Sequence, residues 1–440
     1  MPRKILISFL GTNNYLPCNY YDEEDGQQRK VESVRFVQQA ISQLYCTGFT
    51  PDDVAYFFVT KEANAKNWID NGHLDFKTKE PIEVEGLDNC LKKQNQAHQI
   101  KCVEISEGFS TADIWEIFQT IFSKIQEDDE VYFDITHAFR SLPMLGMVLI
   151  NYAKVLRNIT VKGIYYGAFE KLGPAPEVSK TPIAARNAPI LNLVSFSELQ
   201  EWTKAASSFV DTGNAQKLND IIGQENAELG AKMLDFTNAI ATCRGSEVIG
   251  TIDIKALKQL VKSTQNTTIA VQLAPLLARV EAKIEPFNDI DVNNGFAAVD
   301  WCIAHNLIQQ GYTFLQETIV SYLVVKTAGL LYMNNYNYRE GIMVILGSIK
   351  EYRNAADKLA GARAWNENKV NIQAAYAAKE YIEQMGQKGK LLKNSYQKLT
   401  GPSGLRNDIN HCGFKNEAAT ADRLADELKQ LTERVRECLL

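Results

Sequence analysis

The first 180 residues alternate between short apolar runs and longer segments with helical periodicity, and this alternation limits the fold more than any other feature. The apolar runs are Lys4–Leu10, Val54–Thr60, Ile100–Ile105, Glu130–Ile135 and Val161–Tyr166. The helical segments between them are Val31–Tyr45, Leu87–Ala97, Thr111–Gln126 and Leu142–Leu156. Strands that alternate with helices predict a parallel, Rossmann-like α/β sheet. A short hairpin strand within Tyr15–Tyr21 is expected beside the first strand.

The pattern changes in a stretch with four prolines between residues 174 and 189, which is typical of a linker. Beyond Phe196 the sequence predicts helices alone, and the first of them opens with a capping box at Ser197. A long helix is expected over Ala297–Leu331, and the last one runs from about Thr420 to Cys438. We therefore predict three domains: an α/β domain at 1–180, a helical linker or insertion at 181–293, and a helical domain at 294–440.

Composition narrows the classes of function. The net charge of −6 excludes a globally basic coat for nucleic acid, so any RNA contact would depend on a local basic patch. The eight cysteines form no CxxC pair, which argues against a zinc site or a redox motif. The apolar start is too short for a signal peptide, and no run reaches the roughly 18 apolar residues of a membrane span. We expect a cytoplasmic protein with neither a metal site nor a membrane segment.

Polar residues directly follow two of the predicted strands. The motif Gly11-Thr12-Asn13-Asn14 comes after the first strand. The motif Asp134-Ile-Thr136-His137-Ala-Phe139-Arg140-Ser141 comes after the strand that begins at Glu130. Ligands of a parallel α/β sheet bind outside the carboxyl ends of its strands, and glycine lets the backbone turn tightly there. The two motifs therefore predict one crevice that both of them line.

The second motif favours an anionic ligand. Pro143 suits the first turn of the following helix, whose amino-terminal N–H groups would point at the crevice. Arg140 could add a bidentate phosphate contact, and His137 could donate to phosphate or face a base. Each motif alone also fits an ordinary turn, with Asp134 as a cap and His137 as a structural hydrogen-bonding residue. The absence of GxGxxG and GxxxxGK[ST] argues against dinucleotide or P-loop nucleotide binding.

The tail combines an arginine and a histidine between helix breakers. The segment Thr400-Gly-Pro402-Ser-Gly404-Leu-Arg406-Asn407-Asp-Ile-Asn-His411-Cys-Gly413 predicts a short helix from near Ser403 to Gly413. Arg406 and His411 would lie about 140° apart around it, whereas Asn407 and His411 share a face. RNA cleavage without metal needs a proton carrier and stabilised charge on phosphorus, which histidine and arginine can supply, and Asn407 could orient either. The residues equally fit a surface salt-bridging arginine and a capping histidine.

On these residues the chain resembles the CRISPR-associated CARF–HEPN ribonucleases of type III systems, in particular the branch with a large helical insertion. The tail motif is similar to the HEPN signature Arg-Asn-Xaa-Xaa-Xaa-His, and the two strand-end motifs are similar to the ligand motifs of the CARF domain. Also typical are Glu107-Gly108-Phe-Ser110, Tyr165-Tyr166-Gly167-Ala168, and the helix Trp301–Gly311 with Glu317 further on. The middle, about Ser195–Asn293, is similar only in being helical.

The resemblance implies a metal-independent endoribonuclease that cuts single-stranded RNA once cyclic oligoadenylate binds across a homodimer, with a higher oligomer also open. His411 and Arg406 would carry the chemistry with support from Asn407, and the product would be a 2′,3′-cyclic phosphate. The residues implied for activator binding are Gly11, Thr12, Asn13, Gly108, Ser110, Thr136, His137, Phe139, Arg140 and Gly167. Cyclic tetra-adenylate is the expected ring and cyclic hexa-adenylate the alternative. Ala138 stands where the family often has glycine, which would narrow the pocket.

Other functions fit parts of the sequence. A CARF sensor without catalysis could act through its helical body on a partner or on DNA, but it would have no need of Arg406, Asn407 and His411. An unregulated toxin-type HEPN ribonuclease would leave the α/β domain unexplained. Slow degradation of the activator by the CARF domain itself is also compatible with this sequence.

Overall fold

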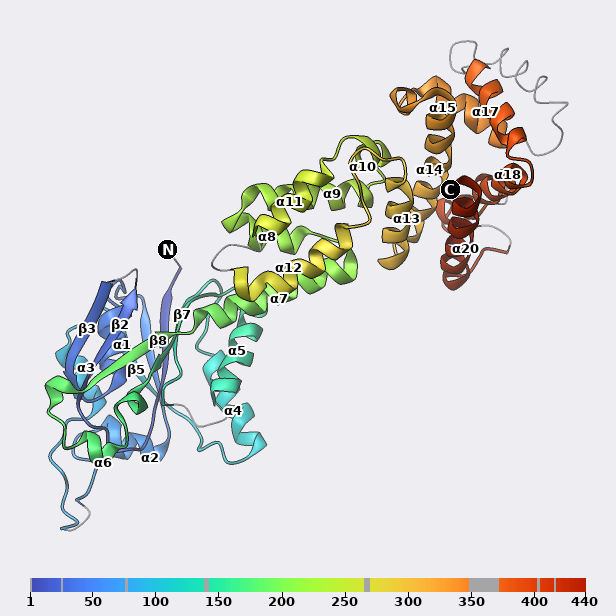
Figure 1. The fold of residues 1–440 in the computed structure, drawn as a ribbon. Helices are drawn as coiled ribbons and strands as arrows, with labels where there is room; N and C mark the ends of the chain where they lie inside the picture. The colour runs from blue at the N-terminus through green and yellow to red at the C-terminus, as the bar shows by residue number, and fades with distance from the viewer. Residues whose placement is uncertain are drawn as a thin grey trace. The chain divides into compact units, whose positions relative to one another are not determined.

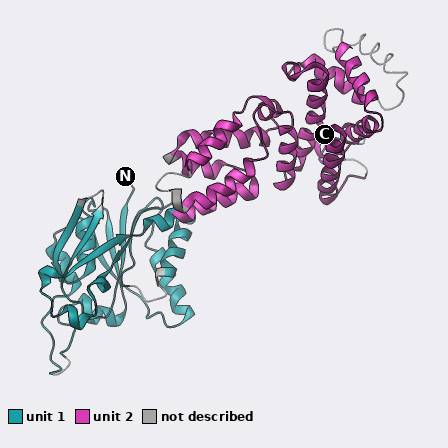
Figure 2. Cartoon of the chain, in the orientation of Figure 1, with its two compact units in different colours: residues 1–198 teal, residues 199–440 magenta. Residues whose placement is uncertain are grey.

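The computed structural model describes residues 2–24, 27–75, 78–137, 142–264, 270–347, 372–401, 404–414 and 417–440 (Figure 1). These residues form two compact units, 1–198 and 199–440 (Figure 2). The first unit holds the sheet and the second is helical. The fold therefore confirms an α/β region followed by an all-helical one.

Among the described residues of the first unit, eight strands form one sheet, in the order β3-β2-β8-β7-β6-β1-β4-β5. Their bounds are β1 Lys4–Leu10, β2 Cys18–Glu24, β3 Gln27–Val34, β4 Val54–Val59, β5 Gln99–Glu104, β6 Glu130–Asp134, β7 Thr160–Gly167 and β8 Asn187–Asn192. Strands β5, β4, β1, β6 and β7 are mutually parallel. The five predicted strands and their parallel arrangement are thus confirmed.

Three expectations about the first unit are wrong in detail. The hairpin β2–β3 does not lie beside β1, because β2 pairs with β8 at the other side of the sheet. Residues 31–34 belong to β3, so the predicted helix at Val31 begins only at Val37. The strand β8 lies beyond residue 180, and the first unit extends to Glu198. The position of the hairpin and of β8 depends on contacts between residues far apart in the sequence. For example, the Asn19 side chain in β2 donates to the Ile183 carbonyl oxygen at 2.9 Å.

Helices cover both faces of the sheet because successive residues of a strand point to opposite sides. Leu6 of β1 packs with α1 and α3, whereas Ile5 and Ile7 pack with α4 and α5. The longer helices of this unit are α1 Val37–Tyr45, α3 Leu87–Lys93, α4 Thr111–Phe122 and α5 Leu142–Arg157. The short ones are α2 Lys61–Ala63, η1 Asn64–Trp68, η2 Phe169–Leu172, α6 Ala175–Val178 and η3 Ile183–Ala185.

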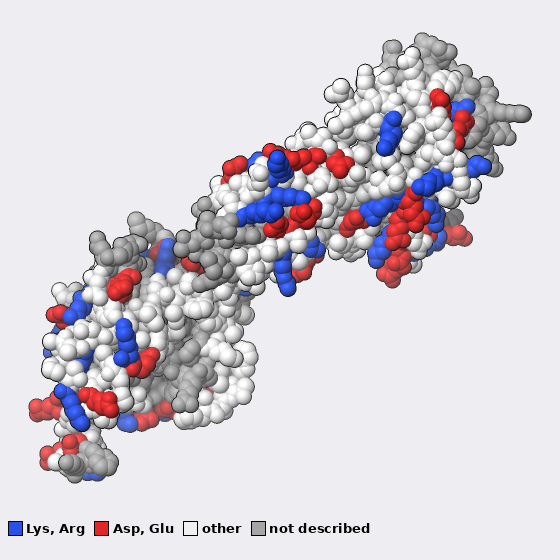
Figure 3. Space-filling model, viewed as in Figure 1, with Lys and Arg blue, Asp and Glu red and all other residues white. Residues whose placement is uncertain are grey.

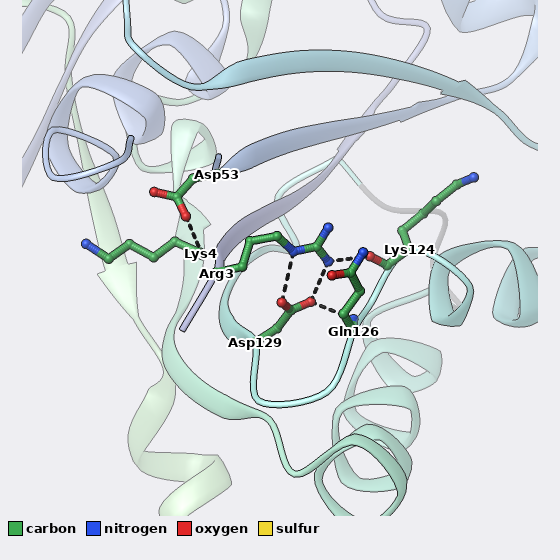
Figure 4. Close-up of polar contacts among 6 residues, drawn as sticks. All are labelled: Arg3, Lys4, Asp53, Lys124, Gln126 and Asp129. Atoms are coloured by element: carbon green, nitrogen blue, oxygen red, sulfur yellow. Dashed lines mark hydrogen bonds and ion pairs between the residues drawn. The ribbon is translucent and has the colours of Figure 1, made fainter. Parts of the chain in front are cut away.

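Ion pairs and hydrogen bonds fix the amino ends of the central strands (Figure 4). The guanidinium of Arg3, just before β1, donates to both carboxylate oxygens of Asp129, just before β6, at 3.0 and 2.6 Å. The backbone N–H of Lys4 donates to Asp53, just before β4, at 2.6 Å. These contacts stabilise the edge of the sheet where the strands begin. The polar motifs lie at the opposite edge, where the strands end.

The second unit packs around one hydrophobic core that extends from Trp202 to Leu439. Its first helix, α7 Val194–Thr212, begins in the first unit. The others are α8 Gln216–Glu225, α9 Ala227–Ala241, α10 Gly245–Gly250, α11 Ile254–Thr264, α12 Ala270–Ile284, α13 Asn294–Ala304, α14 Ile308–Ala328, η4 Leu330–Tyr332, α15 Tyr336–Gly347, α17 Ile372–Gln384, α18 Gln387–Thr400, α19 Leu405–Asn410 and α20 Ala421–Leu439. Throughout the described residues, no helix has the length and apolar character that crossing a membrane requires.

The long helix predicted over Ala297–Leu331 is two helices, α13 and α14. Asn306 between them has a positive φ of 58°, which ends a right-handed helix. The ring nitrogen Nδ1 of His305 lies 3.1 Å from the Asp211 carbonyl oxygen of α7, which holds the turn in place. The last helix, α20, starts after a Thr420 cap as expected.

Candidate functional site

A pocket of about 290 Å³ lies at the carboxyl ends of the central strands. The chain leaves β1 toward β4 and β5 on one side and later adds β6 and β7 on the other, so this edge is the topological switch point of the sheet. The lining residues are Phe9, Leu10, Gly11, Thr12, Asn13, Tyr15, Phe58, Thr60, Ile105, Thr136 and His137. The structure therefore brings the two predicted motifs together in one crevice.

Asn67, which sequence reasoning missed, holds the loop after β1. Its side chain is fully buried, and its amide group donates to the carbonyl oxygens of Gly11 and Asn13, both at 2.9 Å. Its side-chain oxygen accepts from Arg35 at 3.3 Å and lies 2.9 Å from Nε2 of His73. Asn67 belongs to η1, a π-helical turn, and such turns often occur at functional sites. No short motif marks it in the sequence.

The floor of the pocket is aromatic. The rings of Tyr15 and His137 lie with centroids 4.3 Å apart and a tilt of 35°. A Cβ atom at Gly11 would lie 2.3 Å from the Tyr15 hydroxyl oxygen, so only glycine allows this approach. Burial lowers the pKa of His137 to about 4, which keeps its ring neutral at pH 7. His137 can therefore donate or accept a hydrogen bond, but it brings no positive charge to the pocket.

Asp134 shapes the turn after β6 from within. Its side chain is fully buried, and it accepts from the Ser8 hydroxyl at 2.6 Å and from the Thr136 hydroxyl and N–H at 2.6 and 2.9 Å. Burial raises the pKa of this carboxyl group. The Thr136 hydroxyl in turn accepts from the Gly167 N–H at 2.9 Å. The single hydroxyl donor of Thr136 is engaged by Asp134, so the Thr136 hydroxyl can only accept a hydrogen bond from a ligand. Thr136 and Gly167 therefore position the turn.

The remaining predicted activator residues divide into two groups. Gly108 has a positive φ of 73°, and the Ser110 hydroxyl accepts from the Asp113 N–H at 3.1 Å as the cap of α4. Neither Gly108 nor Ser110 is among the described residues that line the pocket. Phe139 and Arg140 lie outside the described residues. The pocket as described therefore offers backbone, Thr12, Asn13 and a neutral imidazole.

The tail motif forms the short helix α19 and the turn after it. Asn407 donates from its side chain to the Gly401 carbonyl oxygen at 3.0 Å, which holds the start of the helix. His411 is the exposed residue that ends α19, and its backbone N–H donates to the Asn407 carbonyl oxygen at 3.0 Å. The Nε of Arg406 is buried and has no hydrogen-bond partner among the described residues. The helix is shorter than the span predicted from Ser403 to Gly413.

A buried N–H group without a partner, such as Nε of Arg406, is costly, because burial removes its water without replacing the hydrogen bond. A structural arginine would be expected to pair with a carboxylate or a carbonyl group. Nε of Arg406 instead has no partner among the described residues, and the exposed His411 follows five positions later in the same motif. Such a pair can hold a phosphate group and move a proton. Among the described residues there is no group of three or more side chains suited to bind a metal ion.

Two family models match parts of the chain, and both lie within residues 5–288. Residues 5–170 match the family model for the CARF domain of the CRISPR system endoribonuclease Csx1. Residues 198–288 match the model for the second domain of CRISPR-associated protein MJ1674. That protein, from Methanocaldococcus jannaschii, is 27% identical over 298 residues, which cover 66% of this chain and 44% of the relative. The chain thus matches less than half of the length of this relative.

Proposed function

This chain is a CRISPR-associated protein with a CARF domain, and we propose that it is an endoribonuclease activated by cyclic oligoadenylate. It would cut single-stranded RNA without a metal ion, as part of type III antiviral defence. The observation that carries the proposal is Arg406, whose buried Nε has no partner among the described residues and whose neighbour in the motif is the exposed His411. A HEPN-type ribonuclease site would explain why this Nε has no partner.

The chemistry follows from the residue types. The 2′-oxygen of the RNA attacks phosphorus, and the bond from phosphorus to the 5′-oxygen breaks. The 2′-hydroxyl loses a proton, the leaving 5′-oxygen gains one, and the products are a 2′,3′-cyclic phosphate and a 5′-hydroxyl. His411 serves as general acid or base, and Arg406 stabilises the negative charge on the phosphoryl oxygens. Asn407 acts as a positioning residue, because its bond to Gly401 fixes the start of the helix that carries both.

The pocket in the first unit would take the activator. Its volume of about 290 Å³ lies just below the roughly 300–1,000 Å³ that hold a drug-sized ligand, and a ring of four adenylates is larger than such a ligand. Each chain would therefore hold part of the ring, with cyclic tetra-adenylate favoured and cyclic hexa-adenylate the alternative. The neutral ring of His137, beside Tyr15, suits contact with an adenine base better than with a phosphate.

A second copy of the chain would complete the pocket. An apolar stripe runs along the exposed face of α5, which begins five positions after His137. Its members recur at helical spacing: Met144 is 75% exposed, Val148 56%, Tyr152 46% and Val155 78%, with Trp115 of α4 nearby in the fold at 60%. Contiguous exposed apolar side chains of this kind mark interaction surfaces. We propose that α5 of one copy packs on α5 of another, so that the two pockets adjoin.

The test uses the full-length chain and labelled single-stranded RNA in EDTA, with rings of three, four and six adenylates compared side by side. We expect cutting only when one of the rings is present. His411→Ala should abolish cutting and leave ring binding intact, whereas Cys412→Ala, the exposed neighbouring residue, should cut normally. Cutting at the wild-type rate by His411→Ala would refute the assigned site. Ring binding by the wild-type chain without any RNA cutting would favour the non-catalytic sensor.

A further inference from the structure

A second pocket, of about 650 Å³, lies within the helical unit. It opens between α10, the middle of α14 and the connection from α14 to α15. Its polar lining includes Arg244, Ser246, Thr313, Glu317 and Asn334. The volume lies within the roughly 300–1,000 Å³ of pockets that hold one small ligand, so a single nucleotide fits.

This pocket adjoins the arginine of the tail motif. Gln309, in the first turn of α14, donates from its side chain to Asn410 of α19 at 3.4 Å. Thr313 lines the pocket one helical turn further along α14, which is about 6 Å at 1.5 Å per residue. Cys243, also in the lining, has a thiol pKa that burial raises and that the charges of both Arg406 and Arg244 lower. The thiol of Cys243 is therefore within electrostatic reach of both guanidinium groups.

The charged groups at this pocket that have no oppositely charged partner among the described residues are arginines. Glu317 is paired with Arg339 at 2.5 Å, so these two side chains neutralise each other. The side chain of Arg244 is exposed and forms no hydrogen bond or ion pair with any described residue, and Nε of Arg406 has no partner in the same set. On the face that Figure 3 shows, basic and acidic side chains are interspersed, with no single basic band for an RNA strand. A strand would thus depend on local cations such as these two arginines.

We propose that this pocket is the subsite for a nucleotide next to the scissile phosphate of the RNA, an inference that rests on the proposed function. Arg244 binds the phosphate of that nucleotide, while Arg406 binds the phosphate that is cut. Asn334, exposed at the rim, offers both a donor and an acceptor to the edge of the base. Single-stranded RNA is recognised in this way, since its unpaired bases can be turned out into pockets.

The experiment compares Arg244→Ala with Arg279→Ala in the full-length chain. Arg279 is a matched control, because it is an exposed arginine of the same unit on α12 and does not line the pocket. With saturating activator, Arg244→Ala should raise the KM for RNA roughly tenfold and leave kcat and the activator requirement close to wild type. Asn334→Ala should change which base flanks the cut when sites are mapped on a random-sequence RNA pool.

Equal KM values for the two arginine variants, together with an unchanged cut-site profile for Asn334→Ala, would overturn the inference. The same comparison is made on binding of labelled RNA to chains that also carry His411→Ala. Binding does not depend on cutting, so a failure of the proposed ribonuclease activity is separated from a failure of the pocket. If the Arg244→Ala chain binds RNA as tightly as the Arg279→Ala chain, the pocket is no RNA subsite.

Discussion

At the scale of single residues, the pocket at the carboxyl ends of the central strands depends on the side chain of Asn67. Asn67 is not among the described residues that line this pocket. Asn67 satisfies two carbonyl groups of the loop after β1, and its own oxygen is held by Arg35 and His73. The loop positions Thr12 and Asn13, both in the lining of the pocket. The geometry offered to an activator therefore depends on a residue outside both predicted motifs.

Asn67→Ala should weaken activation by cyclic oligoadenylate, although Asn67 is not among the described residues that line the pocket. The substitution leaves the Gly11 and Asn13 carbonyl oxygens without their donor, at a cost of about 1–3 kcal/mol in the free energy of unfolding. We expect the cyclic oligoadenylate concentration for half-maximal RNA cutting to rise about tenfold. Chemical denaturation and activation curves measure the two effects. Asn64→Ala is the control and should change neither, because Asn64 belongs to the same turn and its side chain makes no hydrogen bond to the loop among the described residues.

The candidate site was predictable where short motifs at strand ends define it. Gly11, Thr12, Asn13, Thr136 and His137 meet in one pocket because the carboxyl ends of parallel strands share an edge. The role of Asn67 could not be predicted, since the two carbonyl groups that it holds lie more than fifty positions away along the chain. Local hydrogen bonds also occupy residues that were predicted to bind the activator. The Ser110 hydroxyl, for example, accepts from the N–H of Asp113 in the first turn of α4.

At the scale of elements, the buried central strands were predictable and the peripheral ones were not. The run Val54–Val59 is buried on both faces and reads as continuous apolar sequence. The strand β8, in contrast, ends in exposed residues and depends on β2 and β7 for its hydrogen bonds. The break between α13 and α14 also escaped prediction, because a packing contact from α7 stabilises it and the apolar periodicity continues on both sides.

The apolar stripe of α5 makes a prediction about assembly. A charge placed at Val148, in the middle of the stripe, would be buried without a partner when two copies pack together. Val148→Glu should therefore convert a dimer into a monomer in light scattering and abolish activator-dependent cutting. Leu74→Glu serves as the control, because Leu74 is 60% exposed against 56% for Val148 and lies away from α5 in a loop of the same unit. A Val148→Glu dimer of wild-type affinity would contradict the proposed interface.

At the scale of the whole molecule, one continuous helix joins the unit that would bind the activator to the unit that would cut. The helix α7 spans residues 194–212, and the division between the units falls at 198/199. Near its start, the Ser197 hydroxyl lies 2.9 Å from Nζ of Lys154 at the end of α5. Near its end, the Asp211 carbonyl oxygen meets His305 between α13 and α14. Each end of α7 is thus bonded within its own unit, to α5 in the first unit and to the turn between α13 and α14 in the second.

If α7 couples activator binding to RNA cutting, substitutions that destabilise this helix should weaken the coupling. The chain should still bind the activator and still cut RNA. We choose Thr203 and Ser207, both exposed on α7, and replace both with glycine, which costs about 1 kcal/mol each relative to alanine in a helix. The double alanine variant is the control, because it loses the same hydroxyl groups and keeps the helix stiff. We expect the glycine variant to bind cyclic oligoadenylate normally, yet the ratio of cutting rates with and without activator should fall several-fold. By reciprocity, RNA should also lose its effect on activator affinity. Equal activation of the glycine and alanine variants would show that the signal travels by another route, such as contacts between the two copies.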